Sequence, residues 1–168
     1  MKVAVISDTH DNWPNLKKTC SYFKKKEINI LIHCGDLCAP ATLRKCLAVE
    51  FEGQIHIIKG NVDGDQYLNY KRAMEFDNIS LYHEEIGEFE IDGRKIAIQH
   101  YPKLARGLAC TGDYNAVFYG HDHIKHQEKI SETLLANPGN LCDIKAPASF
   151  GIYDTKDNKI EIIDLENI

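Results

Sequence analysis

The sequence predicts an α/β domain in which two mixed β-sheets pack face to face, with helices on the outside. In the first half, short β-branched runs alternate with segments whose apolar residues recur at helical spacing. In the second half, runs of alternating apolar and polar residues are joined by turn residues, a pattern typical of hairpins. The first pattern favours a parallel sheet with right-handed crossovers. At 168 residues, the chain is expected to form a single domain, residues 1–168.

Short runs rich in Val and Ile predict the buried strands. Three of them belong to the first half: residues 2–7, 28–33 and 54–60. Residues 114–121 contain another such run, which ends in a glycine and a histidine. Three hairpins are expected around it, with turns at Asp92-Gly93, near Ser131-Glu132 and at Asp157-Asn158.

Two helices are predicted between the strands of the first half. Asn12 is expected to cap the first helix, and Pro14 is tolerated in its first turn. The three consecutive lysines at 24–26 fit the solvated C-terminal end of this helix. The second helix is expected over residues 40–51. Its apolar side would consist of Leu43, Cys46 and Leu47.

Composition excludes several classes of function. The formal charge of −5, without a basic stripe, argues against sequence-independent binding of nucleic acid. The N-terminal apolar run is only four residues long, and no later stretch approaches a membrane span, so a cytoplasmic protein is expected. In that compartment the six cysteines are expected to stay reduced, most of them as small buried side chains.

Five predicted strands end in residues that commonly bind metal ions. These residues are Asp8 and His10, Asp36, Asn61 with Asp63, His100, and the pair His121 and His123. In α/β sheets, sites form outside the carboxyl ends of the strands, so these side chains are expected to meet. A glycine precedes Asp36, Asn61 and His121, and it would let the backbone approach the site closely. The other histidines, His33, His56, His83 and His126, complete no such motif and are expected to be structural or exposed.

This set of side chains predicts a centre for two metal ions. Crowded carboxylates repel one another, and a cation relieves that repulsion. Imidazole with carboxylate suits manganese, iron or zinc, whereas calcium prefers an all-oxygen shell. Seven candidate ligands exceed the needs of one zinc ion and suffice for two ions if one carboxylate bridges them. Paired ions about 3.5–4 Å apart are the usual device of phosphatases and nucleases.

The motifs, in this order, resemble the calcineurin-like metallophosphoesterase superfamily. The blocks are SDTHD (7–11), HCGD (33–36), GNVDG (60–64), QH (99–100), YGHDH (119–123) and NPGN (137–140). The chain's size and its NPG turn are most similar to the small bacterial and archaeal phosphodiesterases of that superfamily. The resemblance implies a two-sheet sandwich flanked by helices in four layers.

The resemblance also implies roles for individual residues. Asp8, His10, Asp36 and His123 would hold the first metal ion, and Asp36, Asn61, His100 and His121 the second. Asp36 would bridge the two ions together with a hydroxide, which would attack phosphorus in line without a covalent intermediate. The implied cofactor is a pair of divalent ions, with manganese favoured and iron, zinc or nickel as alternatives.

Three positions depart from the family pattern. Val62 stands where many relatives carry a histidine that protonates the leaving group. Asp63 is the nearest titratable substitute, as a catalytic residue or as one that orients His10 or a water. Tyr101 follows His100 where glycine is usual, so narrower access is expected. Asp122 replaces a common threonine and either adds negative charge near the metals or points to solvent. Without an efficient general acid, activated aryl phosphodiesters should be favoured.

The expected partner is a small phosphodiester, with no stable nucleic-acid partner and no membrane. Lys103 and Arg106, on a predicted helix after His100, either meet a substrate phosphate or form a solvated helix face. The resemblance also implies a homodimer or homotetramer as the assembly of this chain. The alternative function is a non-catalytic scaffold of the same fold, as in the retromer coat, and a third is a regulator that binds metal or nucleotide without turnover. The complete set of ligand-type residues favours the enzyme.

Overall fold

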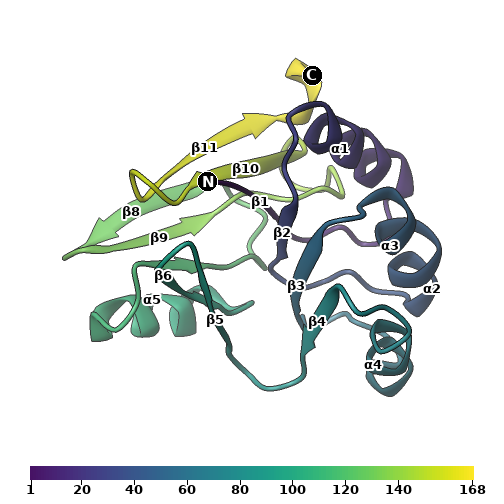
Figure 1. The fold of residues 1–168 in the computed structure, drawn as a ribbon, viewed down its shortest axis with the longest axis horizontal. Helices are drawn as coiled ribbons and strands as arrows, with labels where there is room; N and C mark the ends of the chain where they lie inside the picture. The colour runs from purple at the N-terminus through teal and green to yellow at the C-terminus, as the bar shows by residue number, and fades with distance from the viewer.

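Eleven strands form two sheets in the computed structural model, which describes residues 1–168 (Figure 1). The six-stranded sheet has the order β11 (Lys159–Asp164), β10 (Ser149–Asp154), β1 (Lys2–Ile6), β2 (Ile30–His33), β3 (Gln54–Ile58) and β4 (Ile79–Tyr82). The five-stranded sheet has the order β5 (Gly87–Ile91), β6 (Arg94–Ile98), β7 (Ala116–Phe118), β9 (Thr133–Asn137) and β8 (His126–Ile130). The predicted fold class is therefore confirmed.

Helices cover the outer faces of both sheets (Figure 1). The six-stranded sheet carries α1 (Trp13–Lys25), α2 (Pro40–Thr42), the π-helical turn η1 (Leu43–Leu47), α3 (Ala48–Glu50) and α4 (Gln66–Ala73), and the other sheet carries α5 (Pro102–Thr111). A short 3₁₀ helix, η2 (Leu165–Asn167), ends the chain. As predicted, the Asn12 side chain caps α1, accepting the Asn15 N–H at 3.1 Å. None of the helices has the length and apolar character needed to cross a membrane.

Strand directions bring the predicted site residues to one edge. β1 to β4 run parallel to one another, while β10 pairs with β1 and β11 with β10 in antiparallel fashion. In the other sheet β7 runs parallel to both β6 and β9. The carboxyl ends of β1, β2 and β3 therefore lie side by side, as do those of β6 and β7.

Three apolar clusters hold these layers together. The middle cluster lies between the sheets and joins residues such as Val5 and Ile32 of β1 and β2 to Ile98 and Phe118 of β6 and β7. A second cluster packs the six-stranded sheet against the helices, with Phe23 of α1 fully buried in it. The third packs α5 on the five-stranded sheet. The result is helices, sheet, sheet and helix, in that order.

The three predicted hairpins are confirmed as β5–β6, β8–β9 and β10–β11. The second helix lies where it was expected but contains a π turn. Three elements were not predicted: α4, β4 and the short helix η2. α4 leaves Tyr67 and Tyr70 exposed and so lacks a clear apolar face, and every residue of β4 is only partly buried. Asp65, whose side chain caps α4 by accepting the Leu68 N–H, was the available signal.

A candidate metal centre between the two sheets

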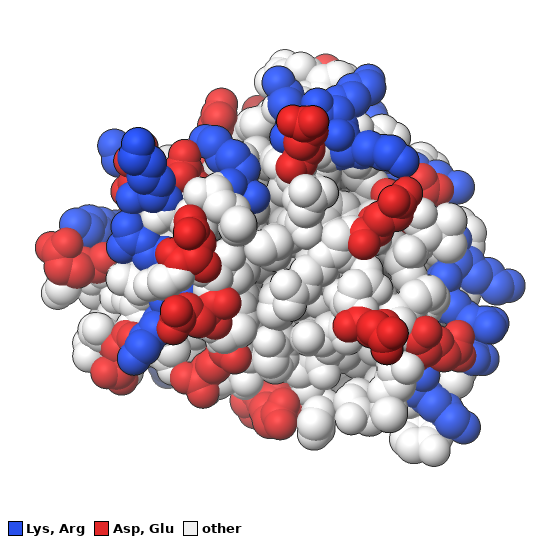
Figure 2. Space-filling model, in the orientation of Figure 1, with Lys and Arg blue, Asp and Glu red and all other residues white.

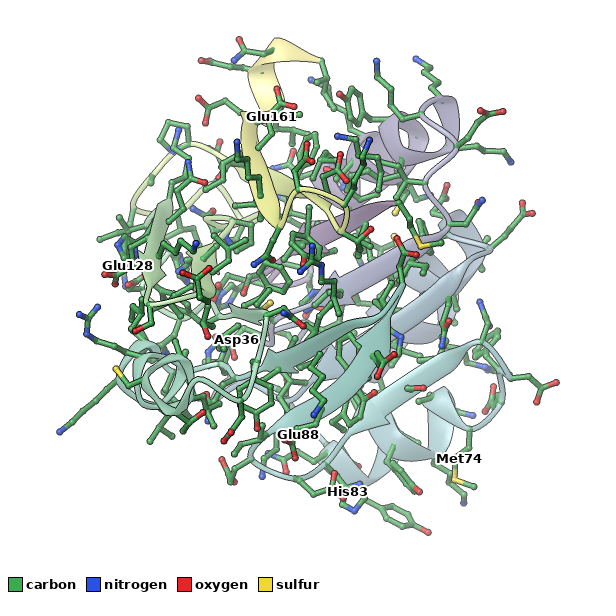
Figure 3. All side chains as sticks on the ribbon, turned by 60° about the vertical axis from the view of Figure 1, so that its left-hand side comes forward. Asp36, Met74, His83, Glu88, Glu128 and Glu161 are labelled. Carbon is green, nitrogen blue, oxygen red and sulfur yellow. The ribbon has the colours of Figure 1, made fainter.

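The structure brings all seven predicted metal ligands together. They lie on the loops that leave the carboxyl ends of β1, β2, β3, β6 and β7, so both sheets contribute. In Figure 3 the labelled Asp36 lies inside the molecule, whereas the labelled His83 projects from its edge. Asp8, Asp36, His100 and His123 are buried, while Asn61 is exposed and opens the centre to solvent.

Four of these residues form a first group of facing donor atoms. The His10 Nε2 atom lies 3.3 Å from His123 Nε2, 3.6 Å from Asp36 Oδ2 and 3.8 Å from Asp8 Oδ1. His123 Nε2 in turn lies 3.4 Å from Asp8 Oδ1. Two imidazole nitrogens and two carboxylate oxygens therefore face a common point.

The second group shares Asp36 with the first. The His100 Nε2 atom lies 3.3 Å from Asp36 Oδ2 and 3.0 Å from Asn61 Oδ1. Asn61 Oδ1 also lies 2.7 Å from His121 Nδ1. The Oδ2 atom of Asp36 thus faces a histidine of each group, which is the position that a bridging carboxylate requires.

Hydrogen bonds outside these groups orient the ligands. His100 Nδ1 lies 2.8 Å from the Cys34 carbonyl and His123 Nδ1 lies 3.1 Å from the Ile144 carbonyl. Because a carbonyl only accepts, each Nδ1 carries a hydrogen, so Nε2 is the ring atom that would offer its lone pair to a bound metal ion. The Oδ1 atom of Asp36 accepts the Val62 N–H at 2.9 Å. This bond leaves Asp36 Oδ2 for the centre.

Strained backbone is concentrated at the same residues. Asp8, His10, Asp36, His121 and His123 have φ values of 50°, 43°, 57°, 77° and 66°. Non-glycine residues rarely adopt this left-handed region, and each such residue costs free energy that the surrounding structure must offset. Their concentration at one place supports a functional site.

All three glycines noted before ligand residues allow the predicted close approach. A Cβ atom at Gly35 would lie 2.5 Å from His100 Nδ1, one at Gly60 would lie 2.0 Å from Asp36 Oδ1, and one at Gly120 would lie 2.5 Å from Asp8 Oδ2. All three distances are far below van der Waals contact. The backbone therefore passes directly against these ligands only because the three residues have no side chain.

The electrostatics of the site favour charged groups. Burial works against an ionised Asp36, but its hydrogen bonds with His100 and the Val62 N–H prevail and hold its pKa below its ordinary value. The hydrogen bond to Asp8 raises the pKa of His10 despite burial. For His100, burial opposes the charge, yet the contact with Asp36 raises the pKa. Carboxylates that attract cations, together with imidazole and amide donors, fit divalent transition-metal ions.

Asp63 and Asp122, whose roles were left open, both bind protein groups. Asp63 Oδ1 accepts the Cys38 N–H at 2.7 Å and Oδ2 accepts the Gly60 N–H at 2.6 Å, so the carboxylate joins two loops of the site. Burial raises the pKa of Asp63. Asp122 Oδ1 accepts from Asn137 Nδ2 at 2.7 Å and from the Ile124 N–H at 3.0 Å. Asp122 is thus tied to the loop and does not simply point to solvent.

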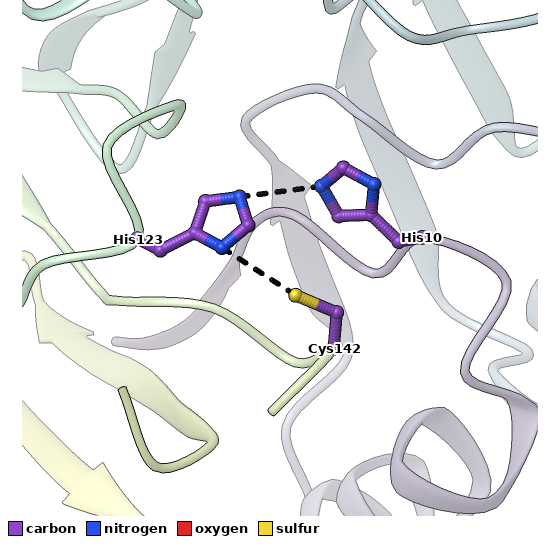
Figure 4. Close-up of side chains that lie close together, drawn as sticks. All are labelled: His10, His123 and Cys142. Atoms are coloured by element: carbon purple, nitrogen blue, oxygen red, sulfur yellow. Dashed lines mark hydrogen bonds between the residues drawn. The ribbon is translucent and has the colours of Figure 1, made fainter. Parts of the chain in front are cut away.

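Sequence reasoning missed two neighbours of the centre, Cys38 and Cys142, and the ring packing of Tyr101. Cys142 Sγ lies 3.5 Å from His123 Nδ1, as Figure 4 shows, and Cys38 Sγ lies 3.7 Å from His10 Nδ1. One donor atom each from His10, His123 and Cys142 lie within 4.8 Å of one another. The Tyr101 ring, expected only to narrow access, packs edge-on against the His100 ring at 5.3 Å between centroids. No sequence spacing pairs the two cysteines with these histidines, because they come from separate loops.

The other four histidines have no hydrogen bond to the predicted ligands. His33 is buried between the Thr9 hydroxyl, 2.7 Å from its Nε2, and the Gly35 N–H, 3.2 Å from its Nδ1. Burial lowers the pKa of both His33 and His56 to about 4. His83 is exposed, and His126 Nδ1 lies 2.9 Å from the Tyr119 hydroxyl. Their positions agree with the expected structural or surface roles.

Carboxylates and imidazoles gathered at strand ends between two packed sheets are the side chains that metal-assisted phosphoester hydrolysis uses. A model of the calcineurin-like phosphoesterase superfamily domain matches residues 1–158, and the chain belongs to that superfamily. Its reaction class is phosphoester hydrolysis.

Individual relatives agree with this assignment. Phosphodiesterase MJ0936 of Methanocaldococcus jannaschii is 30% identical over 172 residues, which cover 99% of this chain and 100% of that protein. The solved structure of an archaeal phosphodiesterase is similar with a TM-score of 0.89 and 27% identity, covering 98% of this chain and 99% of the other. Zinc-bound Vps29 of Entamoeba histolytica has a TM-score of 0.65 and 18% identity, covering 98% and 99%, and shows the fold alone.

Proposed function

We propose that this protein is a phosphodiesterase that depends on two divalent metal ions, with manganese the first candidate. The observation that carries the proposal is the position of Asp36, whose Oδ2 atom lies 3.6 Å from His10 Nε2 and 3.3 Å from His100 Nε2. One carboxylate oxygen shared by two sets of donors suits a bridged pair of ions. The relative MJ0936, named a phosphodiesterase, supports the same activity.

The ligand groups divide the work. Two bound ions would neutralise phosphate oxygens and lower the pKa of an attacking water. Asp8, His10 and His123 would hold the first ion, here called the inner ion. Asn61, His100 and His121 would hold the second ion, here called the outer ion, and Asp36 would bind both. The carbonyl groups of Cys34 and Ile144 fix the rings of His100 and His123, so little reorganisation is needed when ions bind.

Departure of the leaving group is the weak step in this site. Val62 offers no proton, and both carboxylate oxygens of Asp63 already accept backbone N–H groups. Asp63 is therefore better suited to holding the Asp36 and Asn61 loops together than to donating a proton. Activated aryl diesters, whose alcohols leave as anions, should react fastest.

A small diester is a better substrate for this surface than a polynucleotide. In Figure 2, basic and acidic side chains lie mainly around the rim of the visible face, and no basic patch crosses its largely uncharged middle. The formal charge of −5 also opposes a polyanion. Assembly as a homodimer or homotetramer stays a prediction.

The test is turnover of bis(p-nitrophenyl) phosphate by protein loaded with manganese, iron, zinc or nickel, followed by addition of EDTA. We expect two ions per chain by elemental analysis and activity that EDTA abolishes. Two bound ions without turnover would favour the regulator, and less than one bound ion would favour the scaffold. A variant with Ala at Asp36 controls for contaminating enzymes.

A further inference from the structure

A polar hollow of about 260 Å³ lies directly beside the candidate metal centre. Its lining includes Lys59, Asn61, Gln66, Glu85, His100 and Tyr101. Asn61 and His100 are also predicted ligands of the outer ion, so the hollow and the metal centre share these two residues. A phosphorus atom held at the centre would therefore direct one of its ester groups toward this hollow.

Tyr101 forms an aromatic wall of the hollow. Its ring packs edge-on against the rings of His100 and His121, at 5.3 and 5.0 Å between centroids. The backbone N–H of Tyr101 donates to Gln99 Oε1, and the residue forms the N-cap of α5. A ring held in this way is already positioned to stack on a ligand, at little further cost in conformational entropy.

The remaining lining is polar but carries no net charge. Lys59 Nζ lies 2.8 Å from Glu85 Oε1, so the only cation and the only anion of the hollow pair with each other. Asn61 and Gln66 add neutral amides. A hollow with balanced charge favours an uncharged group over a second phosphate. Its volume lies below the roughly 300–1,000 Å³ of sites for drug-sized ligands, which suits a single ring.

We propose that this hollow binds one uncharged aromatic ester group of the substrate and that Tyr101 is its specificity-determining residue. The inference rests on the proposed function, because the metal centre must hold the phosphoryl group for the ester group to reach Tyr101. It adds a substrate class to that function: small diesters that carry at least one aromatic ring.

Calorimetric binding of two inert analogues to manganese-loaded protein tests this assignment without turnover. Phenylphosphonate and methylphosphonate share the phosphoryl group and differ in the ring. We expect the wild type to bind phenylphosphonate about five- to ten-fold more tightly, the size of one good aromatic contact. Tyr101→Gly should remove this preference, and Tyr101→Phe should retain it.

A second variant fills the hollow from another of its lining residues. Gln66 is exposed at the start of α4, so Gln66→Trp should fold and should block phenylphosphonate while methylphosphonate still binds. Manganese content and thermal unfolding are measured for each variant. Equal affinities for the two analogues in the wild type, or a preference that survives both Tyr101→Gly and Gln66→Trp, would overturn the assignment. Failure of both analogues to bind would instead contradict the proposed function of the metal centre, on which the inference rests.

Discussion

Two histidines in neighbouring regions of the molecule behave in opposite ways. His100 and His33 are both buried, yet the pKa of His100 is raised and that of His33 is lowered to about 4. His100 Nε2 faces the Asp36 carboxylate at 3.3 Å, whereas His33 faces a hydroxyl and a backbone N–H. Direct contact with a carboxylate, and not burial, therefore decides which imidazoles favour positive charge. The same contact distinguishes His10 at the centre from His56 in the sheet.

Removing the Asp36 carboxylate should remove the contact that distinguishes His100 from His33. Asp36→Ala deletes the oxygen that faces both groups of ligands, so binding of both ions should weaken. We expect kcat/KM for an aryl diester to fall by more than about 100-fold, beyond the usual effect of changing a residue behind the ligands. Steady-state kinetics and elemental analysis measure the two effects.

A matched pair of variants controls for the loss of charge alone. Asp36→Asn and Asp122→Asn each replace one carboxylate near the centre with an amide. Asp122 binds Asn137 and the Ile124 N–H, so its variant should keep most of the activity. If Asp36→Asn stays within a few-fold of wild type, Asp36 is not the bridge.

An imidazole added at position 62 tests the missing proton donor of the centre. Val62 is partly exposed beside the centre, and its N–H contacts Asp36. Val62→His should supply the missing proton donor and speed esters with poor leaving groups by up to about 100-fold, the lower end for a placed acid. The measurement is kcat/KM for a series of phenol esters of graded pKa. A flat series in the wild type would contradict this account, and Asp63→Asn would then be tested as the donor.

Removing a histidine from the sheet should change the pH dependence of stability. The pKa of His56 in the folded protein is about 4, below its ordinary value of 6.5, because of burial. The contribution of the buried neutral ring to the free energy of unfolding is therefore fully present above pH 6.5 and is lost as pH falls toward 4. That contribution is on the order of 3 kcal/mol. In metal-free protein, His56→Phe should reduce the fall in the free energy of unfolding between pH 7 and 5.

Urea unfolding at several pH values measures this effect, and an exposed histidine provides the control. His83 has 68% of its side chain exposed, so His83→Phe should leave the pH dependence as it is in the wild type. An unchanged slope in His56→Phe would show that the neutral His56 ring does not contribute.

The smallest effect is expected at the basic residues of α5. Arg106 pairs with Glu128, and Lys103 is exposed, which supports the solvated helix face over contact with a substrate phosphate. Lys103→Ala and Arg106→Ala should leave KM unchanged, and the loss of the exposed ion pair should cost less than about 1 kcal/mol of stability. A several-fold rise in KM for either variant would place that cation at the substrate.

The strands and the ligand set were predictable from sequence because each depends on a local pattern. Val and Ile runs mark β1, β2 and β3, and the parallel arrangement then brings Asp8, Asp36 and Asn61 to one edge. Glycine before a ligand residue indicated close approach of the backbone, which the space around Gly60 confirms. Alternating residues around Asp92 marked a hairpin.

The missed features depend on contacts between segments that are distant in sequence. Tyr101 lies against His121, and Cys142 against His123, only because loops of different strands meet. The hydrogen bond from the Cys38 N–H to Asp63 likewise crosses between loops. Left-handed backbone at Asp8 was also unpredictable, because local propensity opposes it at non-glycine residues.

The candidate centre draws its side chains from both sheets, and this has a mechanical consequence. Asp8, Asp36 and Asn61 follow strands of the six-stranded sheet, whereas His100 and His123 follow strands of the five-stranded sheet. An ion held by both sets acts as a cross-link at one end of the interface between the sheets. Chelation should therefore accelerate amide hydrogen exchange at the carboxyl ends of β1, β2, β6 and β7 together, because the two sheets would lose a shared anchor at the same moment.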